Sequence, residues 1–229
     1  TDVLADHLRD AGVAEDKITV VHNGVRQPFI DEMLASPIDL EKDNIVIGFT
    51  GFINPWHGMD KAIEAIAEHK HLPLKLVCIG DGTILPELKQ QAADLGIADK
   101  VEFKGLVTRD KVLDFVKEFD ISLQPDVTAY ASPLKMFEYM AVGSLIIAPR
   151  TPNIEEILSD ETAVFFEKGN QQPFKASLNE AIENYVNYKH KREAVKQSVI
   201  DKGFVWHENS KRVVDIGQKL AHNQNMSKG

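Results

Sequence analysis

Short apolar runs alternate with amphipathic stretches along most of the chain, and few folds accommodate this pattern. The runs have the length of strands, are rich in β-branched residues and are apolar on both faces, which is typical of a buried parallel sheet. The stretches between them repeat apolar residues at helical spacing. The expected strands are residues 45–50, 74–80, 101–104, 121–124, 145–148 and 163–166.

Strand, helix and strand follow one another at roughly 20–30 residues per unit, which predicts right-handed βαβ crossovers with helices on both faces of the sheet. The predicted fold class is therefore α/β, with a doubly wound, parallel, Rossmann-like sheet. After residue 166 the pattern is wholly helical, and C-terminal helices are expected over residues 173–185, 189–200 and 210–220.

The two ends of the chain differ from this central region. A helix and a short strand at residues 18–21 are expected first, and a more polar stretch with turn residues and prolines predicts a linker. The chain does not begin with Met, so we expect it to be part of a longer protein. The expected division is a terminal unit at 1–22, a linker at 23–44, the Rossmann-like domain at 45–205, and a helix with a disordered polar tail at 206–229.

Composition excludes several classes of function. The 229 residues include 35 acidic and 26 basic side chains, a formal net charge of −9, so broad nucleic-acid binding is not expected. The single cysteine, Cys78, lies in an apolar run, which predicts a buried, inert thiol and no disulfide framework. No apolar run reaches the ~18 residues of a membrane-spanning helix, and the N-terminus does not resemble a signal peptide. A cytoplasmic location is therefore expected.

Ligands of open α/β sheets bind at the carboxyl ends of the strands, where the next helix offers free N–H groups. The first unusual junction of this kind is the loop at residues 51–58. Gly51 lets the backbone approach a ligand closely, and His57 offers a hydrogen-bond donor. A plain connecting loop is the alternative.

The second junction is Gly80-Asp81-Gly82, which follows an expected strand. Two glycines at this spacing are a weak indication of nucleotide binding, because Leu85 occupies the place of the third glycine of the dinucleotide fingerprint. A tight turn required by packing is the favoured interpretation here.

The third junction is the start of a helix, with Ser132 as the expected N-cap and Pro133 at its first position. Its free N–H groups would form an anion site. Lys135 lies in the first turn, where a cation opposes the helix dipole, and a bound anion would explain its presence. Glu138 follows on the same face, so an exposed Lys135–Glu138 pair is the alternative.

Taken together, these junctions resemble family 4 of the glycosyltransferases, which are retaining enzymes of the GT-B fold. In order, the matching segments are residues 17–25, 47–66, 76–82, 101–107 and 132–149, and the sequence PNIEEIL follows at the place of the family's G-x-P-E-x-I-like loop. The resemblance implies that this chain is the C-terminal, donor-binding half of a GT-B architecture. Residues 1–22 would then be a remnant of the N-terminal acceptor domain.

The resemblance also implies roles for individual residues. Glu138 would hold the donor ribose hydroxyls, and Lys135, with the backbone near Ser132, Pro133 and Leu134, would hold the diphosphate. Leu106 and Val107 would contact the base through their backbone, and Gly51 and Gly82 would line the nucleotide groove. No side chain is assigned to catalysis, and no metal or other cofactor is expected.

Three positions depart from the family pattern. Phe52 and His57 stand where the family usually has Arg and Lys, and Tyr130 stands where it has a first acidic residue. His57 would replace the missing Lys when protonated, since a neighbouring phosphate raises the pKa of an imidazole. On this hypothesis, donor affinity weakens above pH 7.

The predicted function is therefore binding of a nucleoside diphosphate sugar in a retaining glycosyltransferase, whose acceptor domain is the expected partner. The base, the sugar and the acceptor stay open, and the isolated chain is expected to turn over little. A non-catalytic nucleotide-sugar-binding module and a Rossmann oxidoreductase are the alternatives. The final helix resembles the segment that crosses back to the acceptor domain, so an exposed apolar patch is expected.

A basic cluster near the C-terminus is a separate feature. A solvated helix face is the main interpretation, and contact with an anionic membrane surface is the alternative. The cluster consists of Lys189, His190, Lys191, Arg192 and Lys196.

Overall fold

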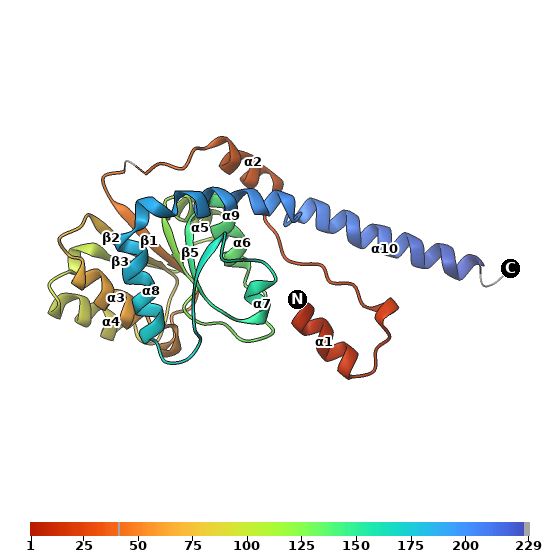
Figure 1. Cartoon of the computed structure of the whole chain (residues 1–229), viewed down its shortest axis with the longest axis horizontal. Helices are drawn as coiled ribbons and strands as arrows, with labels where there is room; N and C mark the ends of the chain where they lie inside the picture. The colour runs from red at the N-terminus through yellow and green to blue at the C-terminus, as the bar shows by residue number, and fades with distance from the viewer. Residues whose placement is uncertain (41, 227–229) are drawn as a thin grey trace.

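The computed structural model describes residues 1–40 and 42–226 and contains a six-stranded parallel sheet with the order β3-β2-β1-β4-β5-β6 (Figure 1). All six expected strands are present, with ends that differ only at Gly80, Gly105, Gln124 and Pro149. The predicted α/β fold class is therefore confirmed. The strands are β1 (Ile45–Thr50), β2 (Leu74–Ile79), β3 (Val101–Gly105), β4 (Ile121–Leu123), β5 (Leu145–Pro149) and β6 (Ala163–Phe166).

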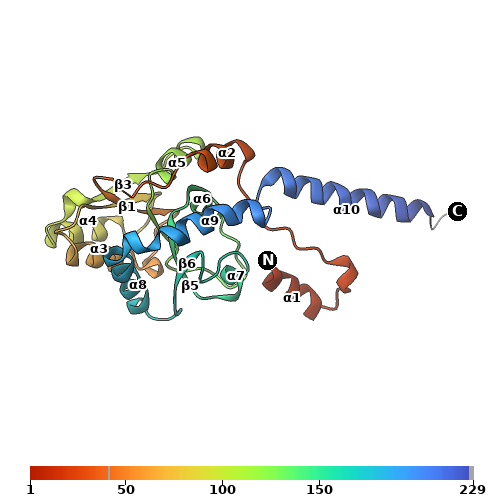
Figure 2. The same cartoon turned by 45° about the horizontal axis from the view of Figure 1, so that its top comes forward.

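Helices cover both faces of the sheet and form two hydrophobic cores with it (Figures 1 and 2). One core is closed by α3, α4 and α8, and the other by α2, α5, α6 and α9. The helices are α1 (Asp2–Asp10), α2 (Gln27–Ala35), α3 (Met59–Glu68), α4 (Leu85–Asp94), α5 (Arg109–Val116), α6 (Leu134–Val142), α7 (Pro152–Glu155), α8 (Gln172–Glu183), α9 (Lys189–Asp201) and α10 (Trp206–Met226).

The strand order reverses between β1 and β4. The chain moves outward from β1 to β3 in one direction and from β4 to β6 in the other, so the connections after β1 and β4 leave toward opposite faces. A crevice opens at the carboxyl ends of the two central strands for this reason. Open α/β sheets bind their ligands at this place.

The N-terminal region differs from expectation in two ways. Residues 18–21 form no strand, because no strand among the described residues pairs with them; an isolated bridge instead joins Val25 to Val205. Residues 23–44 are more than a linker, since they contain α2, which buries Phe29, Ile30 and Met33 in the core beside α6.

The C-terminal region follows the prediction up to its last residues. The three expected helices are present as α8, α9 and α10, but α10 continues through Met226, so residues 222–226 are helical rather than disordered. The rest of the predicted tail, residues 227–229, lies outside the described residues. In both views α10 extends away from the sheet, and α1 lies on the same side of the molecule (Figures 1 and 2). No helix that the structure describes is long and apolar enough to cross a bilayer.

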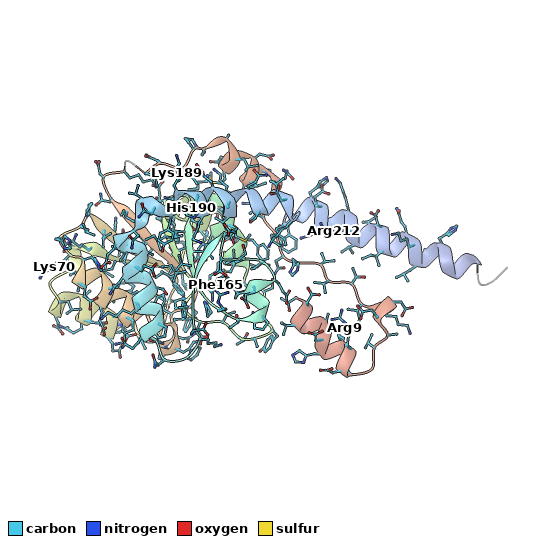
Figure 3. All side chains as sticks on the ribbon, viewed as in Figure 1. Arg9, Lys70, Phe165, Lys189, His190 and Arg212 are labelled. Carbon is cyan, nitrogen blue, oxygen red and sulfur yellow. The ribbon has the colours of Figure 1, made fainter. Side chains whose placement is uncertain are left out.

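The basic cluster on α9 is divided between surface and core. Lys189 and His190 are exposed at the start of the helix (Figure 3). Arg192 and Lys196 are 3% and 8% exposed, and Lys196 donates to the carbonyl oxygen of Ser36. The expectation of one solvated basic face is therefore wrong for these two residues, which are not available to a lipid surface.

Asp120 ties α9 to the sheet at the residue before β4. Its fully buried carboxylate accepts hydrogen bonds from the Val46 backbone N–H at 3.0 Å, from Lys42 Nζ at 3.0 Å and from Arg192 Nη2 at 3.2 Å. Arg192 also donates through Nε to the carbonyl oxygen of Gly143. Because buried charges destabilise a fold unless they are paired, each of these groups depends on the others.

Replacement of Asp120 by Ala should therefore lower the free energy of unfolding by about 3–5 kcal/mol, since it leaves the Arg192 guanidinium buried without its carboxylate. Urea denaturation monitored by circular dichroism measures this change. Asp160→Ala is the matched control, because Asp160 pairs with Arg150 at the surface and its loss should change stability little. Equal effects of the two substitutions would contradict the role given to Asp120.

Candidate functional site

A cavity of about 610 Å³, here called the edge pocket, opens at the carboxyl ends of β1, β2 and β3 and the start of α6. This position is the crevice expected from the strand order. The edge pocket is lined by Thr50, Gly51, Phe52, Asn54, His57, Ile79, Gly80, Asp81, Leu106, Val107, Arg109, Val112, Pro133, Leu134, Lys135 and Glu138.

The glycines after β1 and β2 allow two loops to pass against each other at the floor of the pocket. Gly51 and Gly80 both have φ of +132°, a conformation that L side chains rarely adopt. A Cβ on Gly80 would lie 2.1 Å from the Gly51 carbonyl oxygen, and a Cβ on Gly82 would lie 2.2 Å from that of Ile53. Gly82 does not line the edge pocket. Close packing of the loops accounts for the Gly80-Asp81-Gly82 sequence.

The loop at residues 51–58 folds so that His57 faces the pocket as a neutral ring. His57 Nδ1 accepts a hydrogen bond from the Asn54 backbone N–H at 3.1 Å, so the Nε2 atom carries the proton in the neutral ring. Burial, together with the nearby Lys135 ammonium, lowers the pKa of His57 to about 4. In the free protein His57 is therefore uncharged at pH 7, and it is not a ready replacement for a lysine.

The start of α6 presents backbone donors to the pocket. Helix α6 begins at Leu134, and its N-cap is Pro133 rather than Ser132. The buried hydroxyl of Ser132 has no hydrogen-bond partner among the described residues. The backbone N–H groups of Leu134 and Lys135 likewise have no partner within residues 1–40 and 42–226. Unpaired N–H groups at the positive end of a helix favour an anion.

Lys135 brings an ammonium group to the same end of the pocket. Its Nζ lies 4.1 Å from the centroid of the Phe49 ring, and the position of a Cβ on Gly51 would be 3.7 Å away. Burial lowers the pKa of Lys135 to about 7. A bound anion would raise this pKa again, because an opposite charge stabilises the protonated form of Lys135.

Glu138 lies one turn further along α6 and is 4% exposed. Its Oε1 accepts a hydrogen bond from Arg109 Nη2, whereas its buried Oε2 has no partner among the described residues. Burial raises the pKa of Glu138, and the Arg109 guanidinium opposes that increase. A buried acceptor without a donor is costly, so Oε2 is prepared for a donor from a ligand.

The structure brings most of the predicted site residues together in one cavity. Ser132 and Gly82 lie outside its lining, and so does Tyr130, which is 60% exposed. The exposed Lys135–Glu138 pair, which was the alternative interpretation, is not among the ion pairs of the described residues. Gly51, Phe52, His57, Leu106, Val107, Pro133, Leu134, Lys135 and Glu138 line the edge pocket.

Sequence analysis missed Arg109, which also lines the pocket and pairs with Glu138. The available signal is its place at the first position of a helix, where a cation opposes the dipole, as Lys135 does in the first turn of α6. Cys78 is buried as predicted, and burial raises the pKa of its thiol to about 12.

One group of possible metal ligands occurs elsewhere in the described part of the chain. Single ligand atoms of Asp2, His22 and Glu156 lie within 4.8 Å of one another. Both oxygens of Glu156, however, accept backbone N–H groups of α1, from Asp2 at 2.8 Å and from Val3 at 3.0 Å. The group therefore fastens the positive end of α1 to the residue after α7, and that end disfavours a cation.

The sequence of this chain is similar to a family profile and to several known proteins. The sequence profile described as Glycosyl transferases group 1 matches residues 32–199. The Phosphatidylinositol N-acetylglucosaminyltransferase GPI3 subunit of Saccharomyces cerevisiae is 25% identical over 211 residues, which cover 89% of this chain and 46% of that protein. The D-inositol 3-phosphate glycosyltransferase of Acidothermus cellulolyticus is 27% identical over 164 residues, which cover 65% of this chain and 36% of that protein.

Solved structures of glycosyltransferases share the fold of this chain. A glycosyltransferase from Rickettsia africae superposes with a TM-score of 0.78 at 18% identity, covering 97% of this chain and 62% of its own. Anabaena HepE in complex with UDP superposes with a TM-score of 0.67 at 19% identity, covering 91% of this chain and 60% of its own.

This chain spans less than half the length of the two curated relatives described above. The family profile covers most of the chain, from α2 through most of α9, and includes the strands and helices that form the edge pocket. The chain belongs to the glycosyl transferases group 1 family.

Proposed function

We propose that this chain is the nucleotide-sugar-binding domain of a retaining family 4 glycosyltransferase. The observation that carries the proposal is the edge pocket, where an anion site and a buried carboxylate acceptor face one cavity at the reversal of the strand order. Two proteins with this fold support the proposal. Anabaena HepE has been solved in complex with UDP. Pneumococcal GtfA has been solved in complex with UDP and GlcNAc, and it superposes with a TM-score of 0.72 at 15% identity, covering 97% of this chain and 44% of its own.

The diphosphate of the donor is assigned to the start of α6. The free N–H groups of Leu134 and Lys135 and the Lys135 ammonium are the donors available there. Negative charge on the diphosphate grows as the bond to the sugar breaks, and fixed donors stabilise it without reorganisation. On this proposal, the leaving group needs no metal ion.

The nucleoside is assigned to the other end of the pocket. Glu138 Oε2 would accept from a ribose hydroxyl, because it is a buried carboxylate oxygen with no protein donor. Leu106 and Val107 follow β3 at the rim, where their backbone would contact the base. His57 Nε2–H remains available as a neutral donor to the phosphate or sugar.

A further domain is assigned to the side of the molecule where α1 and α10 lie. Both helices expose apolar side chains, Leu4 and Leu8 on α1 and Val213, Val214 and Leu220 on α10. In both views the two helices lie away from the sheet (Figures 1 and 2). We propose that these side chains contact the acceptor domain of the intact enzyme.

Nucleotide binding tests the proposal directly. A thermal-shift panel of UDP, GDP, ADP, their sugars and NAD should reveal stabilisation by one nucleoside diphosphate series, by about 2.7 kcal/mol at 100 times the dissociation constant.

Lys135→Ala and Glu138→Ala should each weaken binding roughly 10–150-fold, because each removes a charge-assisted hydrogen bond. Lys89→Ala and Glu87→Ala on α4, outside the pocket, are the matched controls. A response to NAD alone would favour the oxidoreductase alternative.

The affinity should also depend on pH through Lys135. Its pKa near 7 in the free protein rises when the diphosphate binds, so the complex takes up a proton and affinity falls as pH rises above 7, by at most about tenfold per pH unit. Calorimetric titration between pH 7 and 9 measures this, a range above the ~6 pKa of the phosphate itself.

Two variants assign that pH dependence. Lys135→Arg should flatten the profile, because arginine stays charged throughout this range. His57→Gln should retain the slope, since His57 is already neutral. A flat profile for the unmodified protein would contradict the role given to Lys135.

The domain contact has its own test in the full-length enzyme. Val214→Asp together with Leu220→Asp should reduce sugar transfer at least about tenfold, since each buries a carboxylate in an apolar contact. The same pair should leave nucleotide affinity unchanged, because α10 does not line the edge pocket. Unchanged transfer would show that the exposed apolar side chains have another role.

A further inference from the structure

Glu138 lies in the wall between two cavities. Besides the edge pocket, it lines a second cavity of about 300 Å³ behind it. Arg109 is the other residue that lines both. The second cavity is lined by Gly24, Val25, Arg26, Phe29, Arg109, Leu113, Glu138 and Trp206.

Arg109 and Glu138 form an ion pair in which one side chain is buried and the other is mostly exposed. The Glu138 side chain is 5% exposed and fixed within α6, whereas the Arg109 side chain is 68% exposed and reaches across from the first position of α5. A cation at that position opposes the dipole of its own helix, so the fold of α5 does not require it. Within the described residues, the only hydrogen bond or ion pair of the Arg109 side chain is with Glu138.

The pair divides the carboxylate into two unlike oxygens. Oε1 is held by Arg109 Nη2, while Oε2 is buried and unpartnered. A carboxylate that is fixed through one oxygen presents the other in one direction, which is what recognition of a single hydroxyl requires. Without the guanidinium, burial would favour the protonated carboxyl, whose hydroxyl is a donor and no longer a pure acceptor.

We propose that Arg109 is a positioning residue for the nucleoside: it keeps Glu138 ionised and oriented, with Oε2 left free to accept from a ribose hydroxyl. The inference rests on the proposed function, since it gives the ribose to Glu138. Arg109 thereby sets the preference for ribose over deoxyribose without touching the sugar.

Other groups near Glu138 are separate from this role. Arg26 also lowers the pKa of Glu138, but its influence is smaller than that of Arg109, and among the described residues it makes no hydrogen bond with Glu138. Tyr139 donates or accepts at Thr50 rather than at Glu138. The charged and titratable groups that line the two cavities with Glu138 are Arg109, Arg26, Lys135, His57 and Asp81, and Tyr139 is its neighbour on α6.

The direct test is the titration of Glu138 in the free protein, followed by carbon-13 NMR of its carboxyl carbon and assigned with Glu138→Gln. In Arg109→Gln the midpoint should rise by about 1 to 3 pH units, because the opposite charge is lost. Arg109→Lys should return it toward the unmodified value. Arg26→Gln, the matched control, should move it less than Arg109→Gln. Because Arg109 is mostly exposed, these variants should remain folded, which thermal unfolding checks.

The second readout is the ratio of affinities, measured across pH, for the nucleoside diphosphate that the thermal-shift panel selects (UDP, GDP or ADP) and for its 2′-deoxy form. The unmodified protein should favour the ribose form by about tenfold or more at neutral pH. In Arg109→Gln the preference should fall toward one at low pH and return at high pH, with a midpoint that follows the NMR titration. A structural role for Arg109 would weaken both nucleotides equally.

The outcomes separate the inference from the function it rests on. If Arg109→Gln leaves the Glu138 midpoint where it is in the unmodified protein, the positioning role is wrong while nucleotide binding stands. If the unmodified protein binds the ribose and 2′-deoxy forms equally, or binds no nucleoside diphosphate of the thermal-shift panel, the ribose assignment fails and the inference with it.

Discussion

The site depends on one topological constraint, the reversal of strand order between β1 and β4 at the centre of a parallel sheet. Since the connections after these strands leave toward opposite faces, no helix crosses their carboxyl ends. The loop after β1 and the start of α6 therefore meet at one cavity, although Gly51 and Lys135 are far apart in sequence. The buried Asp120 carboxylate, which joins β1 and α9 at the opposite end of β4, holds this arrangement.

The edge pocket buries two ionisable side chains, Lys135 and Glu138, without full compensation of their charges. Burial shifts the pKa of Lys135 downward and that of Glu138 upward, so each is destabilised in its charged form. A ligand with an anionic end and a hydroxyl end would relieve both, and the nucleoside diphosphate part of a sugar donor has this form. Phe52 and His57 supply no positive charge at pH 7, which increases the dependence on Lys135.

The sheet and most of the pocket lining could be predicted because they depend on local patterns. Apolar runs mark buried strands, and the turn residues after them mark the carboxyl edge. Helix α2 was missed because Pro28, the nearby Pro37 and a short apolar pattern resemble a linker, and its stability comes from packing beside α6. The strand expected at residues 18–21 failed for the converse reason, since a strand requires a partner.

The electrostatics could not be predicted in the same way. The pair of Arg109 and Glu138 joins residues that lie 29 positions apart and depends on how α5 packs beside α6. The neutrality of His57 depends on its burial and on the hydrogen bond from Asn54, neither of which is visible in the sequence. Residue types thus indicated where the candidate ligand-binding groups lie, but only packing determined the charge that each group carries.

A crystal structure of this chain with a bound nucleoside diphosphate tests the central claim most directly. The account predicts a ribose hydroxyl against Glu138 Oε2 and phosphate oxygens at the backbone N–H groups of Leu134 and Lys135. A nucleotide bound in another cavity, or in the edge pocket with its phosphates away from α6, would contradict it.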